Sequence, residues 1–185
     1  MTVMIPGQGW VFYAPVDTAA PDIADFDPTS PATSFSGWSW LGSTSKDNLV
    51  AMSKEGGEVT PKDAWDTPNL RTEKSTETWS MTNNAIAIEQ DTLTLAFPNG
   101  TWDAQKQMYS LAAKNSIISK ALLVVMKDDV SGVGCIYAPN AALSVGDAPT
   151  LDAENFFEVP LSATLQTSPT TGSPWGLGTP RPLND

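Results

Sequence analysis

Histidine is absent from the 185-residue sequence, and cysteine occurs only once. Without histidine the chain cannot build a Ser-His-Asp or Cys-His catalytic centre or a His-ligated zinc site. A single cysteine, Cys135, excludes an internal disulfide and a thiolate metal cluster. Because its neighbours are glycines and strand-forming residues, we predict that Cys135 is a small buried apolar group and not a reactive thiol.

Basic residues are also scarce. Lysine and arginine number 10 against 21 aspartates and glutamates, so the formal net charge is −11. This balance argues against a surface that grips nucleic-acid phosphates or anionic lipid. No apolar run approaches the roughly 18 residues of a membrane span. The N-terminus lacks a basic segment, so we expect no signal peptide and a start in a reducing cytoplasm.

Hydrophobic residues make up 41% of the chain, which is enough for the core of one ordinary domain. We assign residues 1–166 to a single β domain. Residues 167–185 hold four prolines, three glycines and one aromatic residue, Trp175. Such a composition cannot bury a core of its own, so we predict a C-terminal arm that is flexible in isolation.

Short apolar or alternating segments, separated by turn residues, predict a succession of strands. The run between Lys120 and Lys127 holds six consecutive apolar residues and predicts a strand buried on both faces. About seven strands with little helix favour an antiparallel β-sandwich or barrel. The predicted strands are 10–16, 35–42, 72–82, 106–113, 119–127, 133–138 and 154–166.

Two segments are harder to assign from pattern alone. Residues 89–97 alternate like a strand, yet their acidic start and Pro-Asn-Gly stop also suit a short helix. Residues 43–61 are polar and of mixed charge, with a glycine pair at 56–57. They are too long for a tight turn, and we predict a projecting hairpin or an extended loop.

Candidate catalytic or metal-binding groups all fall in predicted turns or loops. Asp128 and Asp129, like Glu55 and Glu58, lack evidence of the cleft that an acid–base pair needs. The acidic stretch 22–27 lacks the ordered spacing and the closing glutamate of a calcium loop. We therefore predict no catalytic residue, no metal site, no cofactor and no enzymatic activity.

Seven tryptophans are many for this length. Trp38 and Trp40 alternate with Ser39, which would place both rings on one face of a strand. They predict either a sugar-stacking platform or, with much greater weight, part of the sandwich core.

Four groups of segments follow one another in a characteristic order between residues 37 and 165. They are GWSWLGSTSKDN (37–48); EGGE (55–58) with AWD (64–66) and LRT (70–72); ETWSMT (77–82) with 89–97; and GCIYAPN (134–140) with ALSVGD (142–147) and FEVPLSA (157–163). In this succession the chain resembles the major tail protein, or tail tube protein, of long-tailed siphovirus-type bacteriophages, especially those that infect actinobacteria. The usual Asp-Gly of that family is Asp47-Asn48 here, a mild departure because asparagine tolerates positive φ.

The resemblance implies a structural virion protein with a β-sandwich and one short flanking helix at about 89–97. It implies hexameric rings that stack into a tail tube, a homo-oligomer assembled in the host cytoplasm. The tape measure protein, other tail proteins at the tube ends and genomic dsDNA in the lumen are the implied partners, and no membrane is involved. A net negative lumen would repel phosphates and let the DNA pass during ejection.

In the resembled family the long loop after the second strand reaches the adjacent ring. Within 43–61 this implies inter-ring contacts at five charged residues. These candidates are Lys46, Asp47, Lys54, Glu55 and Glu58. We also predict that Trp175 anchors the C-terminal arm in a pocket on a neighbouring subunit. The alternatives are another virion β-sandwich, such as a tail terminator or capsid decoration protein, and a glycan- or receptor-binding module that uses Trp38 and Trp40.

Overall fold

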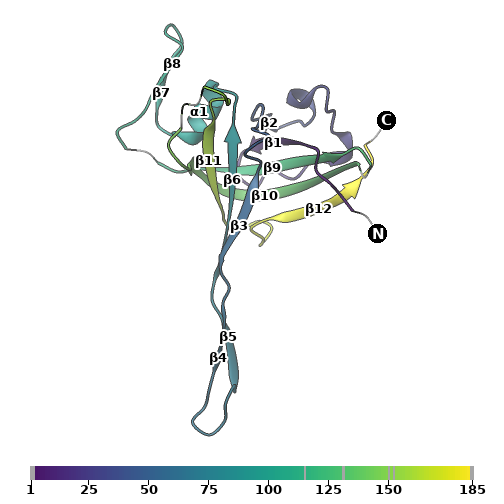
Figure 1. Ribbon diagram of the computed structural model, residues 1–185, viewed down its shortest axis with the longest axis vertical. Helices are drawn as coiled ribbons and strands as arrows, with labels where there is room; N and C mark the ends of the chain where they lie inside the picture. Colours follow the sequence, from purple (N-terminus) through teal and green to yellow (C-terminus); the bar gives the residue numbers. More distant parts are fainter. Residues whose placement is uncertain (1–2, 115, 131, 150, 152, 184–185) are drawn as a thin grey trace.

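A computed structural model describes residues 3–114, 116–130, 132–149, 151 and 153–183. Over these residues the chain is mainly antiparallel β structure with one α-helix, α1 (Gln90–Ala96), which confirms the predicted fold class. Figure 1 shows a body of strands from which a long hairpin projects at one end. The strands are β1 (Gln8–Ala14), β2 (Ser39–Trp40), β3 (Ala51–Gly56), β4 (Val59–Lys62), β5 (Arg71–Lys74), β6 (Glu77–Ala85), β7 (Thr101–Asp103), β8 (Met108–Ser110), β9 (Ile118–Asp128), β10 (Gly132–Val145), β11 (Val159–Leu165) and β12 (Gly176–Arg181).

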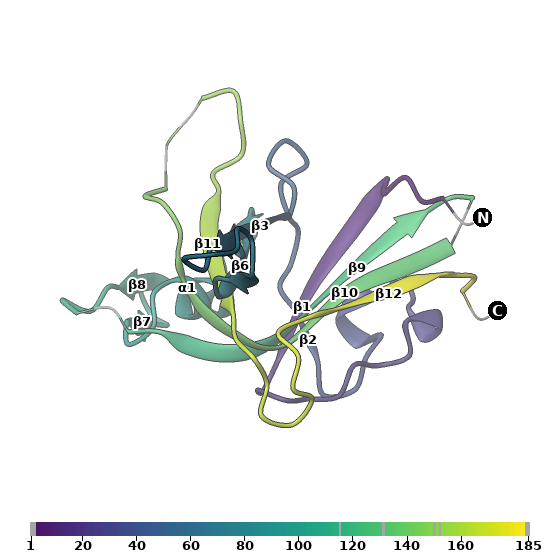
Figure 2. The ribbon, with the colours of Figure 1, turned by 90° about the horizontal axis from the view of Figure 1, so that it is seen from below.

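Eight of the strands form one sheet in the order β2-β1-β9-β10-β11-β6-β3, with β12 also paired to β10. The first part of β10 lies between β9 and β12, and its last part lies between β9 and β11. The sheet therefore divides along β10. Seen from below, β1, β9, β10 and β12 spread to one side of the molecule while β6, β11 and α1 lie on the other (Figure 2).

The predicted end of a strand at Pro139 is wrong, because β10 continues through this residue to Val145. The pairing with β9 shifts register between Ala138 and Ala141. Proline has no backbone N–H to give to a ladder, and an irregularity in the pairing is the usual way for a strand to include it. This bulge lies where β12 gives way to β11 as the neighbour of β10.

The apolar run of β9 is buried on both faces of the sheet, as predicted. Leu122 and Val124 belong to a core cluster that includes Leu95 of α1, whereas Leu123 and Val125 belong to a second cluster on the other face. The loop between β1 and β2 contributes Ile23, Phe26, Phe35 and Trp38 to the second cluster. Each face of β9 thus has its own cover.

Cys135 lies in the second cluster and is buried, as predicted. Burial raises the pKa of its thiol, which disfavours the reactive thiolate.

The segment 89–97 forms a helix and not a strand, since α1 spans Gln90–Ala96. The helix turns Leu95 and Ala96 inward. Asp91 lies in its first turn and accepts a hydrogen bond of 2.9 Å from Tyr13 Oη. Burial and then this bond raise the pKa of Tyr13 to about 12. The chain leaves the helix through Asn99, which has a φ of 71°.

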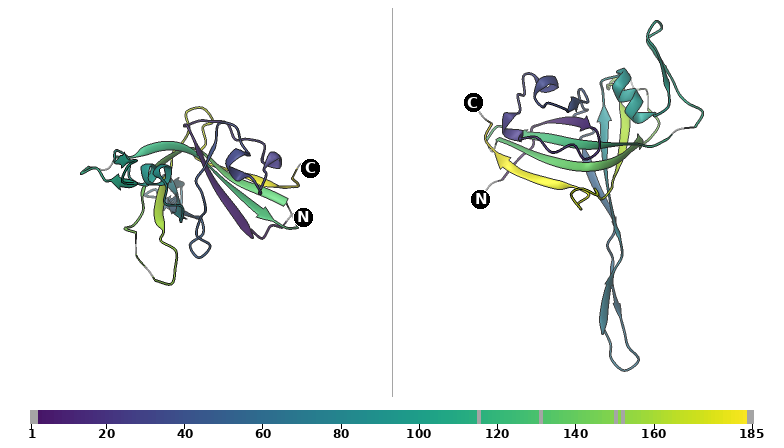
Figure 3. Two further views of the ribbon diagram at one scale, coloured as in Figure 1. Left: turned by 90° about the horizontal axis from the view of Figure 1, so that it is seen from above. Right: turned by 180° about the vertical axis from the view of Figure 1, so that it is seen from behind.

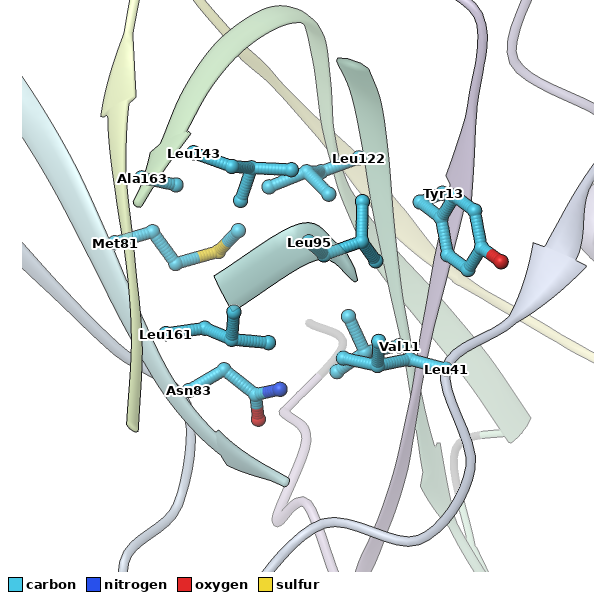
Figure 4. Close-up of a pocket in the computed structure, with 10 residues that line it drawn as sticks. All are labelled: Val11, Tyr13, Leu41, Met81, Asn83, Leu95, Leu122, Leu143, Leu161 and Ala163. Atoms are coloured by element: carbon cyan, nitrogen blue, oxygen red, sulfur yellow. The ribbon is translucent and has the colours of Figure 1, made fainter. Parts of the chain in front are cut away.

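A small apolar cavity of about 20 Å³ lies between α1 and the sheet (Figure 4). This is the size of a single water molecule and far below the several hundred Å³ of a typical ligand pocket. Asn83 of β6 lines it, and neither amide atom of this buried side chain has a hydrogen-bond partner among the described residues. A buried polar group without a partner costs about 1–3 kcal/mol.

We predict that Asn83→Leu raises the free energy of unfolding by about 1–3 kcal/mol, because it removes that cost and fills apolar space. Asn84→Leu is the matched control. The amide of Asn84 donates a hydrogen bond of 2.6 Å to Glu158, so this neighbouring change should destabilise the protein. Urea unfolding of both variants measures the difference. A lower free energy of unfolding for Asn83→Leu than for the wild type would show that the Asn83 side chain stabilises the fold.

Candidate functional site

The most prominent feature of the surface is a long β-hairpin that we call the arm, residues 51–85. Its base is the β3–β6 ladder, which ends at the pair Gly56 and Glu77. Its outer half is the separate β4–β5 ladder, from Val59 opposite Lys74 to Lys62 opposite Arg71. The arm extends along the longest axis of the molecule, away from the body (Figure 1).

The prediction of a projection at 43–61 is correct in kind but wrong in its bounds. Residues 43–50 stay at the body, and the projection is a pair of strands that also includes 71–82. The predicted strand at 72–82 covers most of β5 and runs on into β6, whereas β4 was not predicted; both outer strands are exposed on both sides. A strand that packs on nothing has no reason to alternate apolar with polar residues.

Every residue from 58 to 76 is exposed except Ala64. The tip is closed by a hydrogen bond of 2.8 Å from the Ala64 N–H to the Thr67 carbonyl and one of 2.7 Å from the Asn69 N–H to Asp63. Trp65 is fully exposed at this tip, and Leu70 is 66% exposed. A two-stranded ribbon is at best marginally stable by itself in water. The outer half of the arm therefore has little support within its own chain.

The glycine pair at 56–57 marks the junction between the two ladders of the arm. Gly56 and Gly57 have φ values of 73° and 76°, which residues other than glycine rarely adopt. A Cβ on Gly57 would lie 2.6 Å from Glu77 Oε1. Glycine is thus required here for the outer ladder to begin.

The base of the arm is joined to the C-terminal segment by a cluster of aromatic and charged side chains. Trp79 of β6 packs edge-on against Trp175, with their ring centroids 5.1 Å apart. Lys54 Nζ lies 5.9 Å from the Trp79 ring and 3.3 Å from Glu77 Oε1. Hydrogen bonds from Lys74 and then Lys54 lower the pKa of Glu77. The cluster links both base strands of the arm to the chain's C-terminal part.

The expectation of a flexible C-terminal tail is wrong for the described residues. Ser168 is fully buried and bonds to Asp17, which also accepts a hydrogen bond of 2.9 Å from Thr170. Gly176–Arg181 then form β12 against β10. The C-terminal segment is ordered by hydrogen bonds and by the addition of β12 to the edge of the sheet. Both need little apolar surface, so amino-acid composition does not reveal this order.

The sequence-predicted contact residues fall at different places. Lys46 and Asp47 lie in a loop held at the body, where the Asn48 amide donates a hydrogen bond of 2.8 Å to Glu158. Hydrogen bonds from Ser45, Asn84 and Asn48 lower the pKa of Glu158.

Lys54, Glu55 and Glu58 lie on the arm. Lys54 is engaged in the cluster at its base, and the other two are exposed. Trp175 contacts Trp79 of its own chain, and its contact with a neighbouring subunit stays a prediction. Sequence analysis missed Trp65 and Leu70, although a tryptophan in a polar stretch was a usable signal.

The sheet offers further surfaces at its edges. Among the described strands, β12 pairs with β10 alone. β1 pairs with β9 along its whole length, but with β2 only at Phe12 and Tyr13. The outer edges of β12 and of the first half of β1 thus present backbone groups that a strand of another molecule can meet.

Other candidate sites lose support in the structure. Trp38 is 6% exposed and its indole N–H donates to the Ala19 carbonyl, so it cannot stack on a sugar. Asp22 caps a 3-10 turn and pairs with Arg181. Within the described residues, no three His, Cys, Asp or Glu side chains come together to hold a metal. No helix in the same residues is long and apolar enough to cross a membrane.

We predict that Trp175 and Trp79 stabilise the base of the arm together. In a double-mutant cycle of Trp175→Ala and Trp79→Ala, urea unfolding should give a coupling energy of about 0.5–1.5 kcal/mol, the range of a packed aromatic pair. Strictly additive losses would mean that the two rings act separately.

Comparison with curated proteins gives no match. A family model described as phage tail tube protein matches residues 1–175. This range includes the complete arm, α1 and all strands of the main sheet except β12. Because the match covers nearly the whole chain, this protein belongs to the phage tail tube protein family.

Proposed function

We propose that this protein polymerises as stacked, hexameric rings into the tube of a siphovirus-type phage tail, with an actinobacterial host. Family membership makes it a structural tail tube component of a virion. The observation that carries the stacking is the uncovered outer arm, residues 58–76. A ribbon this exposed gains stability when a neighbouring ring covers it.

Lateral contacts within a ring are supported by the sheet edges. The open edge of β12 and that of β1 lie at opposite sides of the half-sheet β1-β9-β10-β12. Pairing of β12 in one copy with β1 in the next is a heterologous contact, which closes a ring when the rotation is right. Ring closure also removes two free edges that would otherwise promote aggregation. The number of six copies comes from the resemblance to the family.

The charge of −11 supports a conduit role. DNA moves freely through a lumen whose net charge is negative, because each exposed cation would hold a phosphate by counterion release. The proposal includes passage of dsDNA, a tape measure protein inside the growing tube, other tail proteins at its ends and assembly in the host cytoplasm. It assigns the chain no cofactor and no enzymatic role.

We predict that deletion of residues 58–75 abolishes tube formation and leaves the body folded. The deletion joins Gly57 to Thr76 and leaves a two-residue connection across the last β3–β6 pair, Gly56 and Glu77. A deletion of 47–56 is less suitable because it removes β3. Circular dichroism checks folding, and negative-stain microscopy checks assembly. Tubes of normal length from the deletion variant would show that stacking does not require the outer arm.

We also predict that added salt speeds assembly. Each subunit carries the same net negative charge, so subunits repel one another, and 0.1 M salt screens this repulsion beyond about 10 Å. Light scattering at a series of salt concentrations measures the rate. A rate that falls steadily as salt rises would indicate that attractive ion pairs dominate the contacts.

A further inference from the structure

The arm and a second, shorter hairpin lie at opposite ends of the molecule. The second hairpin, β7–β8, projects beyond α1 at the end away from the arm (Figure 1), and the view from behind shows the same arrangement (Figure 3). In a stack of equivalent rings, an arm that leaves one end of a subunit approaches the other end of a subunit in the next ring. The surface around β7–β8 is therefore the part of the molecule that the arm tip meets first.

The arm tip has the chemistry of an anchor. Trp65 is fully exposed with Leu70 close by in the same tip. Tryptophan is the residue type most enriched among those that dominate binding energy at interfaces. Residues 63–70 also carry two carboxylates, Asp63 and Asp66, and no cation, while Lys62 and Arg71 flank them as the last pair of the β4–β5 ladder.

The opposite end of the molecule has complementary chemistry, within a part that we call the receiving surface, the described residues 98–114 and 116–117. Met108, Leu111 and Ile117 are each at least half exposed there. The one carboxylate of this segment, Asp103, pairs with Lys106, and Lys114 makes the net charge positive in a chain that is strongly acidic as a whole.

The receiving surface is also fixed in place. Tyr109 Oη of β8 donates a hydrogen bond of 2.8 Å to the Phe97 carbonyl at the end of α1. Asn99 Nδ2 donates one of 2.8 Å to Ser116 Oγ. The ring of Tyr109 lies so close to Gly100 that a Cβ there would collide with it. These contacts hold the hairpin against the helix, so a partner does not have to order it first.

We infer that Trp65 at the arm tip of one copy packs against the receiving surface of a second copy in the adjacent ring. This inference rests on the proposed stacking function and names the partner surface of the arm. The contact joins two different patches, so it is heterologous and each copy can both give and receive an arm. Such a contact repeats without closing and extends a stack.

Crosslinking tests the pairing directly. Thr67→Cys at the tip and Ala113→Cys on the receiving surface are made separately, and both positions are exposed. A short bis-maleimide should link a mixture of the two variants into dimers under assembly conditions, and the doubly substituted chain into ladders. Wild type, whose only cysteine is buried, and Ala20→Cys combined with Thr67→Cys are the controls.

Dimers from Thr67→Cys alone would mean a tip-to-tip contact and would overturn the inference. Tubes that form without any link between positions 67 and 113 would overturn it as well.

Substitution tests the energetics. Trp65→Ala should raise the critical concentration for polymerisation at least about tenfold, the effect expected for an interface anchor. Val130→Ala, which trims an exposed apolar residue in the β9–β10 turn, should leave it unchanged. A charge swap tests whether the arm tip and the receiving surface contact each other. Asp66→Lys and Lys114→Asp should each weaken assembly, and the variant that carries both substitutions should recover part of the loss.

The experiments distinguish failure of the Trp65 contact from failure of ring stacking. If the arm deletion prevents tubes but Trp65→Ala has no effect, the inference fails and the stacking function stands. If wild type forms no polymer under any condition that keeps it folded, the stacking function fails and the inference fails with it.

Discussion

The body of the protein depends on the burial of β9 on both faces. Apolar side chains pointing both ways along one strand need two separate covers, and the chain supplies α1 on one face and the loop between β1 and β2 on the other. The neighbours β1 and β10 pair along this strand and take their register from it. The remaining strands pair outward from these three, and the sheet ends in edges whose backbone groups a further strand can meet.

The arm follows the opposite physical rule. Its outer half, residues 58–76, is exposed and packs on no core, so hydrogen bonds between β4 and β5 are the main internal support there. Its direction is set at the base, where Trp79, Trp175, Lys54 and Glu77 tie the arm to the C-terminal segment. The protein therefore separates a body with a buried core from a projection that lacks one.

Sequence patterns predicted those parts of the fold that a hydrophobic core dictates. The run from Ala121 to Met126 predicted β9 correctly, and the alternation near Trp79 predicted β6. Pattern could not choose between helix and strand for 89–97, because Leu93, Leu95 and Phe97 suit both, and the resemblance to the family favoured the helix that the structure has. The resemblance likewise supplied the family, which the family model independently supports.

Elements stabilised without a core were the ones that sequence analysis misjudged. The β4–β5 ladder has no apolar face, and β12 gains its order from the edge of β10 and from hydrogen bonds around Ser168 and Asp17. The same limit applied to the candidate site. Sequence analysis selected the charged residues of 43–61 as contact candidates and did not select Trp65, which lies at the tip of the arm.

If the outer arm becomes covered when the protein assembles, as we propose, hydrogen exchange of its backbone amides must slow on assembly. In the unassembled protein, amides of residues 58–76 should exchange rapidly while those of β9 are protected. In polymerised protein the same arm amides should become strongly protected, with β9 little changed. Equal, rapid exchange of the arm in both forms would contradict the account, because the arm would then remain in solvent in the tube.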